Sequence, residues 1–248
     1  MKAWGVFLLL AGLAFAGLAL VQGVDDLESY RPPQLERGME VAGSISLFKT
    51  ILWMTLGLVV LKLVGFRLEH IIDLSVFATG FVFGSLFGGG VALGLVLLAY
   101  RKTGVMWLYN LSSGMTIVCF SLVLAPFITP DAAMMLFALL ALYDVVGVLF
   151  LPYIKFLWLE VRTRNRKDEK VKKLMKGVAV FTDEGLVGAG DFALPLLFAL
   201  SFGYRGMLAL PLLLIGFGFT QRFARRFGVF PGLPLQALAG FIFYILAT

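Results

Sequence analysis

The sequence predicts an all-α membrane protein with nine transmembrane helices, built as a single membrane domain over residues 1–248. Sixty per cent of the 248 residues are apolar and the mean hydropathy is +0.95, which is too apolar for a soluble domain with a largely polar surface. The apolar residues form long runs, as spanning helices require, and not amphipathic stripes. The alternating pattern of an outer-membrane β-barrel is absent from these runs.

Nine apolar segments are the predicted spans. They cover residues 3–21, 44–64, 71–87, 89–100, 105–128, 131–153, 185–203, 206–220 and 228–247. The stretch from Ile71 to Tyr100 is too long for one helix, and the glycines at 88–90 provide a turn within it. The first span follows a lone Lys2, and its alternative interpretation is a secretory signal peptide.

Lysine and arginine positions predict the orientation in the membrane. With the amino terminus in the cytoplasm, only four of the 21 basic residues lie outside, namely Arg31, Arg37, Lys49 and Arg205. The other 17 (21 less 4) lie on the cytoplasmic side, which is the usual bias of membrane proteins. The net charge of +6 therefore indicates orientation and no nucleic-acid partner, and the carboxyl terminus lies outside.

Metal-binding residue types are scarce. The chain has one cysteine, Cys119, and one histidine, His70. A single cysteine excludes an internal disulfide and a thiolate metal cluster, and these two residues do not make a zinc site. We therefore expect neither a metal nor another cofactor.

Two aspartates lie deep within predicted spans. Asp144 lies thirteen residues after Asp131 in the span 131–153, and Asp191 lies six residues after Gly185 in the span 185–203. An ionised carboxylate inside a bilayer costs several kcal/mol, so each is a candidate functional residue. The two spans are joined by a cytoplasmic loop and run antiparallel. Both carboxylates are therefore expected at similar depth in the cytoplasmic half of the membrane.

Glycine and proline surround the second aspartate. Gly188, Ala189 and Gly190 precede it, and their missing side chains are expected to let another backbone approach closely. Pro195 follows by four residues and is expected to kink the helix, because it removes the hydrogen bond to the Asp191 carbonyl. A phosphate-binding loop is a weaker alternative, since no lysine follows the glycines and no strand is expected before them.

The last span opens on an irregular segment, Pro231-Gly232-Leu233-Pro234. Each proline leaves the carbonyl four residues before it, at Phe227 and Phe230, without its helical partner. The backbone near the cytoplasmic face is therefore expected to be irregular. The simpler alternative is a frayed helix start.

The ordered motifs resemble those of the presenilin and signal peptide peptidase family of intramembrane aspartyl proteases. The chain is more similar to the family's archaeal or bacterial members than to its animal members. Tyr143-Asp144 matches the family's Tyr-Asp pair, and the segment from Gly188 to Asp191 matches its Gly-x-Gly-Asp motif. Pro231-Gly232-Leu233 matches its Pro-Ala-Leu motif, with glycine in place of alanine at 232 and Pro234 following. The nine spans and the cytoplasmic amino terminus agree, so the resemblance extends over the whole chain.

The resemblance implies a presenilin-like fold and an aspartic endopeptidase that cleaves transmembrane or signal-peptide-like helices within the bilayer. Asp144 and Asp191 would share one proton and activate a water, without a metal or a covalent intermediate. Residues 1–130 would form a scaffold of five helices. Residues 131–248 would form a catalytic core of four helices with a cytoplasmic loop at 155–184. Auxiliary subunits and a homo-oligomer are left open.

A short β-prone run, Val178-Ala179-Val180-Phe181, lies just before the second aspartate-bearing span. Because helical carbonyls are shielded by their own hydrogen bonds, a substrate helix must unwind before it is cleaved. We expect this run to form an edge strand onto which the unwound substrate could add. A flexible linker is the plain alternative.

Three other functions remain compatible with the sequence. An ion-coupled transporter or cation leak would also use membrane aspartates and broken helices, but no second copy of the 131–203 unit is evident. A prepilin-type aspartyl peptidase shares the Gly-x-Gly-Asp motif but not the segment 231–234. A purely structural membrane protein would gain nothing from buried aspartates.

Overall fold

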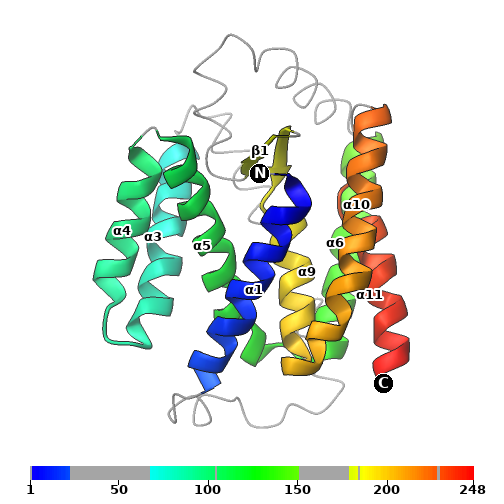
Figure 1. Cartoon of the computed structure of the whole chain (residues 1–248), viewed down its shortest axis with the longest axis horizontal. Coiled ribbons are helices and arrows are strands. Elements are labelled where there is room, and N and C mark those ends of the chain that lie inside the picture. Colours follow the sequence, from blue (N-terminus) through cyan, green and yellow to red (C-terminus); the bar gives the residue numbers. More distant parts are fainter. Residues whose placement is uncertain (1, 23–67, 104, 151–178, 184, 228–229) are drawn as a thin grey trace.

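The structure is a computed structural model that describes residues 2–22, 68–103, 105–150, 179–183, 185–227 and 230–248. Within these ranges it has eight α-helices, two short 3-10 helices and one two-stranded sheet (Figure 1). The elements are α1 (Ala3–Gln22), α3 (Leu68–Ser85), α4 (Gly90–Lys102), α5 (Met106–Leu124), η2 (Ala125–Phe127), α6 (Pro130–Phe150), β1 (Ala179–Thr182), β2 (Gly185–Gly188), α9 (Gly190–Ser201), η3 (Gly203–Ala209), α10 (Leu210–Phe227) and α11 (Pro234–Ala247).

The predicted all-α membrane class agrees with the length and composition of these helices. Four stretches are long and apolar enough to cross a membrane, namely Ala3–Val21, Met106–Phe127, Pro130–Val148 and Gly203–Arg226. Three shorter apolar helices are Ile72–Ser85, Gly190–Ser201 and Pro234–Ala247. The count of nine helices is not reached in the described part of the chain, and the predicted span 44–64 lies outside it.

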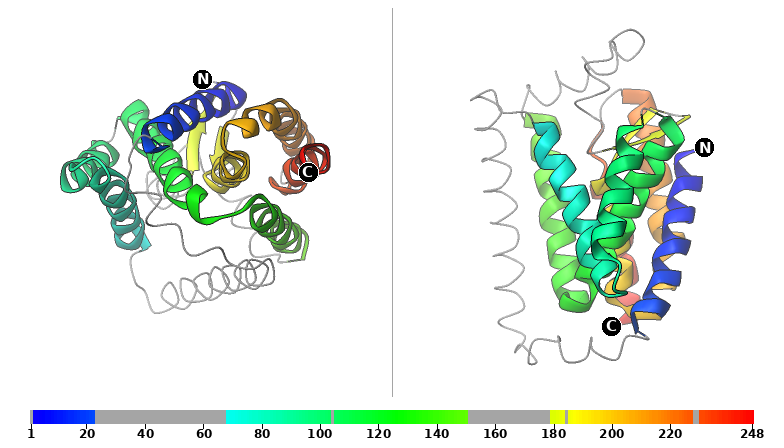
Figure 2. Two further views of the ribbon diagram at one scale, coloured as in Figure 1. Left: turned by 90° about the horizontal axis from the view of Figure 1, so that it is seen from below. Right: turned by 90° about the vertical axis from the view of Figure 1, so that its left-hand side faces the viewer.

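Helix α9 lies in the middle of the bundle, in contact with α1, α5, α6, α10 and α11 (Figure 2). Its apolar side chains face these neighbours on all sides, and Leu196, Phe198 and Ala199 are fully buried. The rings of Phe7 on α1 and Phe217 on α10 lie 6.3 and 5.4 Å from the ring of Phe192 at the start of α9. A helix that is apolar all round belongs in the interior, and Asp191 lies in the first turn of this helix.

Helices α3 and α4 form an antiparallel pair at one side of the molecule (Figure 1). The predicted turn between them is confirmed, because Gly88 has a φ of +72°, which residues with a β-carbon rarely adopt. A β-carbon on Gly80 would lie 3.0 Å from the Cα of Gly94 on the facing helix. These small residues let the two helices pack with their backbones in near contact.

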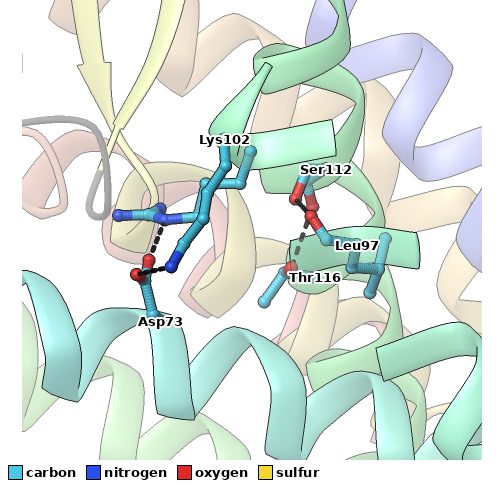
Figure 3. Close-up of polar contacts among 6 residues, drawn as sticks. Asp73, Leu97, Lys102, Ser112 and Thr116 are labelled. Atoms are coloured by element: carbon cyan, nitrogen blue, oxygen red, sulfur yellow. Dashed lines mark hydrogen bonds and ion pairs between the residues drawn. The ribbon is translucent and has the colours of Figure 1, made fainter. Parts of the chain in front are cut away.

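Polar contacts join α3, α4 and α5 (Figure 3). The Asp73 carboxylate on α3 accepts a hydrogen bond from Nε of Arg101 at 2.6 Å and lies 3.2 Å from Nζ of Lys102. Asp73 and Arg101 are buried, whereas the Lys102 side chain is 61% exposed. On α5, the buried Ser112 hydroxyl donates to the carbonyl of Leu97 on α4 at 2.7 Å.

The segment before α9 is a β-hairpin and not the start of a helix. β1 and β2 are antiparallel, with Thr182 opposite Gly185 and Val180 opposite Val187. The span predicted to begin at 185 therefore becomes helical only at Gly190. Glycine is a poor helix former and Val187 favours a strand, so pairing with β1 determines the local structure. The expectation that no strand precedes the glycine motif was wrong.

Candidate active site

Asp144 lies in the second half of α6 and points to the start of α11. One of its carboxylate oxygens, Oδ2, accepts a hydrogen bond from the backbone N–H of Leu233 at 3.0 Å. The side chain is half-buried. The first turn of α6 is stabilised by Pro130 at its first position and by the Thr129 hydroxyl, which accepts a hydrogen bond from the N–H of Ala132. The hydrogen bond from Leu233 orients the Asp144 carboxylate toward α11.

Asp191 is the second residue of α9. The predicted depth required it to be the seventh residue of a longer helix that begins at Gly185, and this prediction was wrong. Its carboxylate lies beside Gly188, the last residue of β2, where a β-carbon built on that glycine would be 3.6 Å from Oδ2. Two residues further on, the Ala193 carbonyl accepts the Ser121 hydroxyl of α5 at 3.3 Å. The hairpin and α5 therefore fix the end of α9 that bears the carboxylate. Asp191 is half-buried and close enough to Asp144 for the two charges to interact.

Gly232 lies directly against Asp191. A β-carbon built on Gly232 would lie 2.6 Å from Cγ of Asp191 and 2.8 Å from its Oδ2, closer than real β-carbons come. By contrast, a β-carbon on Gly188 would meet only the Asp191 carboxylate, at 3.6 Å, and one on Gly190 would meet no described atom within 4 Å. The close approach that the sequence predicted at the two motif glycines is therefore found at Gly232 instead.

The carbonyl of Gly232 accepts two hydrogen bonds from buried side chains. The Thr220 hydroxyl of α10 and Nε2 of Gln236 on α11 each donate to it at 3.1 Å. Sequence reasoning missed both residues. The signal was available, because a threonine and a glutamine inside apolar spans need partners within the protein.

The remaining predicted residues of the helical motifs fall around this segment. Tyr143 is half-buried beside Asp144, and its part stays a prediction. Pro231 and Leu233 are buried, and Pro234 is the first residue of α11, where its missing N–H costs no helical bond. The irregular start of the last span is thus confirmed. Helix α9 runs on through Pro195 to Ser201.

The predicted edge strand is β1, and its described part comprises Ala179, Val180 and Phe181, while Val178 lies outside the described residues. Asn110 of α5, which sequence reasoning also missed, bonds both backbone groups of Phe181. Its Nδ2 donates to the Phe181 carbonyl at 2.6 Å, and its Oδ1 accepts the Phe181 N–H at 3.0 Å. The amide thus occupies the edge of β1 at Phe181, as a neighbouring strand would.

Two half-buried carboxylates on adjacent helices, within electrostatic reach of each other, can hold one proton between them and act as an acid and a base on a water molecule. The segment 231–233 adjoins both of them, through the hydrogen bond of the Leu233 N–H to Asp144 and through Gly232, where a β-carbon would overlap Asp191. The arrangement therefore brings together the three sequence motifs at one place.

The fold is similar to that of a solved presenilin family intramembrane aspartate protease. The two structures superpose with a TM-score of 0.67 over 98% of this chain and 96% of that one, at 17% sequence identity. No protein-family model and no curated protein matches the sequence. At this level of identity the match establishes a presenilin-like fold.

Proposed function

We propose that the chain is an intramembrane aspartic endopeptidase that hydrolyses peptide bonds of transmembrane or signal-peptide-like helices, with Asp144 and Asp191 as the catalytic pair. The observation that carries the proposal is the contact of one backbone segment with both carboxylates, through the Leu233 N–H and Gly232. The presenilin-like fold supports it, because the similar solved structure is that of an aspartate protease.

The proposed reaction needs only the two carboxylates and a water. The ionised carboxylate takes a proton from the water, whose oxygen attacks the scissile carbonyl carbon, while the protonated one donates to the carbonyl oxygen. The tetrahedral diol then collapses: one of its hydroxyls gives a proton to the ionised carboxylate, the C–N bond breaks, and the leaving nitrogen takes the proton of the other carboxylate, so the pair again holds one proton. The half-buried state of both aspartates is consistent with access of water to them.

The hairpin is proposed as the place where the unwound substrate binds as an added strand. Because Phe181 gives both backbone groups to Asn110, Phe181 and Leu186 are a pair without mutual hydrogen bonds. The backbone groups of Leu186 and Gly188 then point away from β1, along an edge that leads directly into Asp191. We therefore propose the outward edge of β2, and not the predicted β1, as the docking edge.

The setting is proposed to be a lipid bilayer with the amino terminus in the cytoplasm and the carboxyl terminus outside. Helix α1 begins at the end of the bundle where the hairpin lies, and α11 finishes at the opposite end, which supports termini on different sides (Figure 1). The substrates would be single-span peptides whose cleavage sites lie near the hairpin end.

The proposal is tested by cleavage of a single-span peptide in proteoliposomes. We expect the wild type to yield two fragments, and an aspartyl-protease transition-state mimic to suppress them. Asp144→Asn and Asp191→Asn should each leave less than about a tenth of the activity, a barrier increase above ~1.4 kcal/mol. Asp131→Asn is the matched control, since its carboxylate instead accepts the Tyr244 hydroxyl. Full activity in either dyad variant, or ion flux without cleavage, would contradict the proposal.

A further inference from the structure

The peptide group between Gly232 and Leu233 is hydrogen-bonded at both of its ends. Its carbonyl oxygen accepts Thr220 Oγ1 and Gln236 Nε2 at 3.1 Å each, and its N–H donates to Asp144 Oδ2 at 3.0 Å. The carbonyl and the N–H belong to one planar unit, so fixing the oxygen fixes the direction of the N–H. Two side chains from two helices thus determine where the N–H points.

The two donors are buried away from solvent. Thr220 is 2% exposed and Gln236 is fully buried. Within the part of the chain that the structure describes, Oε1 of Gln236 is buried with no hydrogen-bond partner. An unpaired buried acceptor lowers stability, so an apolar side chain of similar length would give a more stable protein at this position. The glutamine is therefore better explained by the bond that its Nε2 makes than by packing.

We propose that Thr220 and Gln236 are positioning residues of the protease, which orient the Asp144 carboxylate through the Gly232–Leu233 peptide group. The inference rests on the proposed function. Donation to a carbonyl also polarises the N–H of the same amide, and linked hydrogen bonds strengthen one another by an estimated 10–30% per bond. The two donors therefore strengthen the bond to Asp144 as well as aiming it. The hydrogen bonds that these two side chains donate in the described part of the chain go to the Gly232 carbonyl and not to either carboxylate, so the proposed effect passes through the peptide group.

Kinetics of single variants separate this role from a structural one. Thr220→Val and Gln236→Met remove the donors and keep the side-chain volume. Each should lower kcat by about tenfold and change KM by less than about twofold, because an aligned carboxylate matters in the transition state and not in substrate binding. Thr220→Ser keeps the hydroxyl and should retain most of the activity. Gln236→Met should melt at the same temperature as the wild type or higher, since it removes the unpaired Oε1.

Ser112→Ala is the control for loss of a buried hydroxyl. It breaks the bond from Ser112 to the Leu97 carbonyl, which joins α4 and α5 (Figure 3) and includes no residue of the segment 231–233. It should lower the melting temperature and leave kcat unchanged. The proposal is overturned if Thr220→Val and Gln236→Met keep wild-type kcat. It is also overturned if their losses follow melting temperature alone, or if Thr220→Ser loses as much activity as Thr220→Val.

A readout without catalysis keeps this inference separate from the proposed function. In ¹⁵N-leucine-labelled protein in micelles, the Leu233 amide proton should move upfield in Thr220→Val and Gln236→Met, as its bond to Asp144 weakens. Asp144→Asn assigns the resonance and gives the size of the change. If the wild type cleaves no peptide, the protease proposal fails while the amide shift still tests the relay. An unmoved Leu233 resonance in both variants would refute the relay.

Discussion

Gly232 leaves no room for a β-carbon beside the carboxylate of Asp191, whose Cγ would lie 2.6 Å from it. The presenilin and signal peptide peptidase family, which the motifs resemble, has alanine at this position. From the sequence alone, Gly232 is therefore a neutral exchange of one small residue for another. The structure instead explains the glycine by the lack of space at this position. In this chain the Asp191 carboxylate occupies the volume that an alanine methyl group would need. Either the methyl group or the carboxylate has to shift.

Gly232→Ala should therefore lower kcat by about tenfold or more. The methyl group displaces the Asp191 carboxylate, and a displacement of about 1 Å from the reactive geometry can cost 10²-fold. Gly218→Ala is the matched control on α10, where a β-carbon meets no described atom within 4 Å. It should keep full activity and melt at the same temperature or slightly higher, because alanine favours a helix. Peptide cleavage by Gly232→Ala at the wild-type rate would show that the carboxylate can move freely.

The two aspartates could be found from the sequence because an ionised group in an apolar span is costly. That they lie near each other could also be predicted, because consecutive antiparallel spans place them at similar depth. The depth of Asp191 could not, since apolarity alone does not separate β2 from the first turn of α9. Thr220 and Gln236 were missed because their roles depend on the fold of the segment 231–233, which joins residues twelve and four positions apart. Asn110 lies 71 positions from Phe181, beyond any local pattern.

Docking of substrate on β2 predicts a position-dependent effect of proline. Leu186→Pro removes an N–H that points away from β1, so it should leave the hairpin formed but lower cleavage about tenfold or more through lost strand addition. Leu186→Ala keeps that N–H and should cleave at nearly the wild-type rate. Binding of an active-site mimic should be unchanged in both variants. The test compares the cleavage rate of each variant with its affinity for the mimic. Equal cleavage by the two variants would indicate that the segment is only a linker and does not bind substrate as a strand.

The choice of residue matters for this test. Val180, within the predicted docking run, pairs with Val187 and its backbone groups face β2. Val180→Pro would therefore break the hairpin itself and shift Gly188, which lies beside the Asp191 carboxylate. Loss of activity there would report damage to the site, and it should be accompanied by weaker binding of the mimic. Leu186→Pro should leave the hairpin and mimic binding intact. The two proline variants together therefore distinguish damage to the site from loss of substrate docking.

The ion pair of Asp73 should contribute to stability through its buried partner. Asp73→Asn leaves the Arg101 guanidinium buried without its carboxylate, which costs about 3–5 kcal/mol in similar cases. Lys102→Ala removes the other cation, whose side chain is 61% exposed, and should cost less than about 1 kcal/mol. Unfolding of the two variants in detergent measures the difference. Arg101 also lies over the Tyr109 ring, 5.8 Å from its centroid, and equal losses would mean that its remaining contacts compensate for the Asp73 carboxylate.

Gly206 should be the most sensitive glycine to substitution at the end of α9. A β-carbon there would lie 2.6 Å from the backbone carbonyl carbon of Ala199 and 3.2 Å from its Cα. Backbone cannot rotate away as a side-chain tip can, so Gly206→Ala has to shift η3 from the end of α9. We expect a loss of about 1–3 kcal/mol in unfolding free energy, as for other overpacked sites.

Gly12→Ala is the control for that substitution, because a β-carbon on this glycine of α1 meets no described atom within 4 Å. It should leave the melting temperature unchanged or raise it. Ala199 is eight residues from Asp191 along α9, about 12 Å at 1.5 Å per residue. Gly206→Ala should therefore lower the melting temperature while the folded fraction keeps its kcat. A fall in kcat at a temperature where the variant is fully folded would instead show that strain at this end of α9 is transmitted to Asp191.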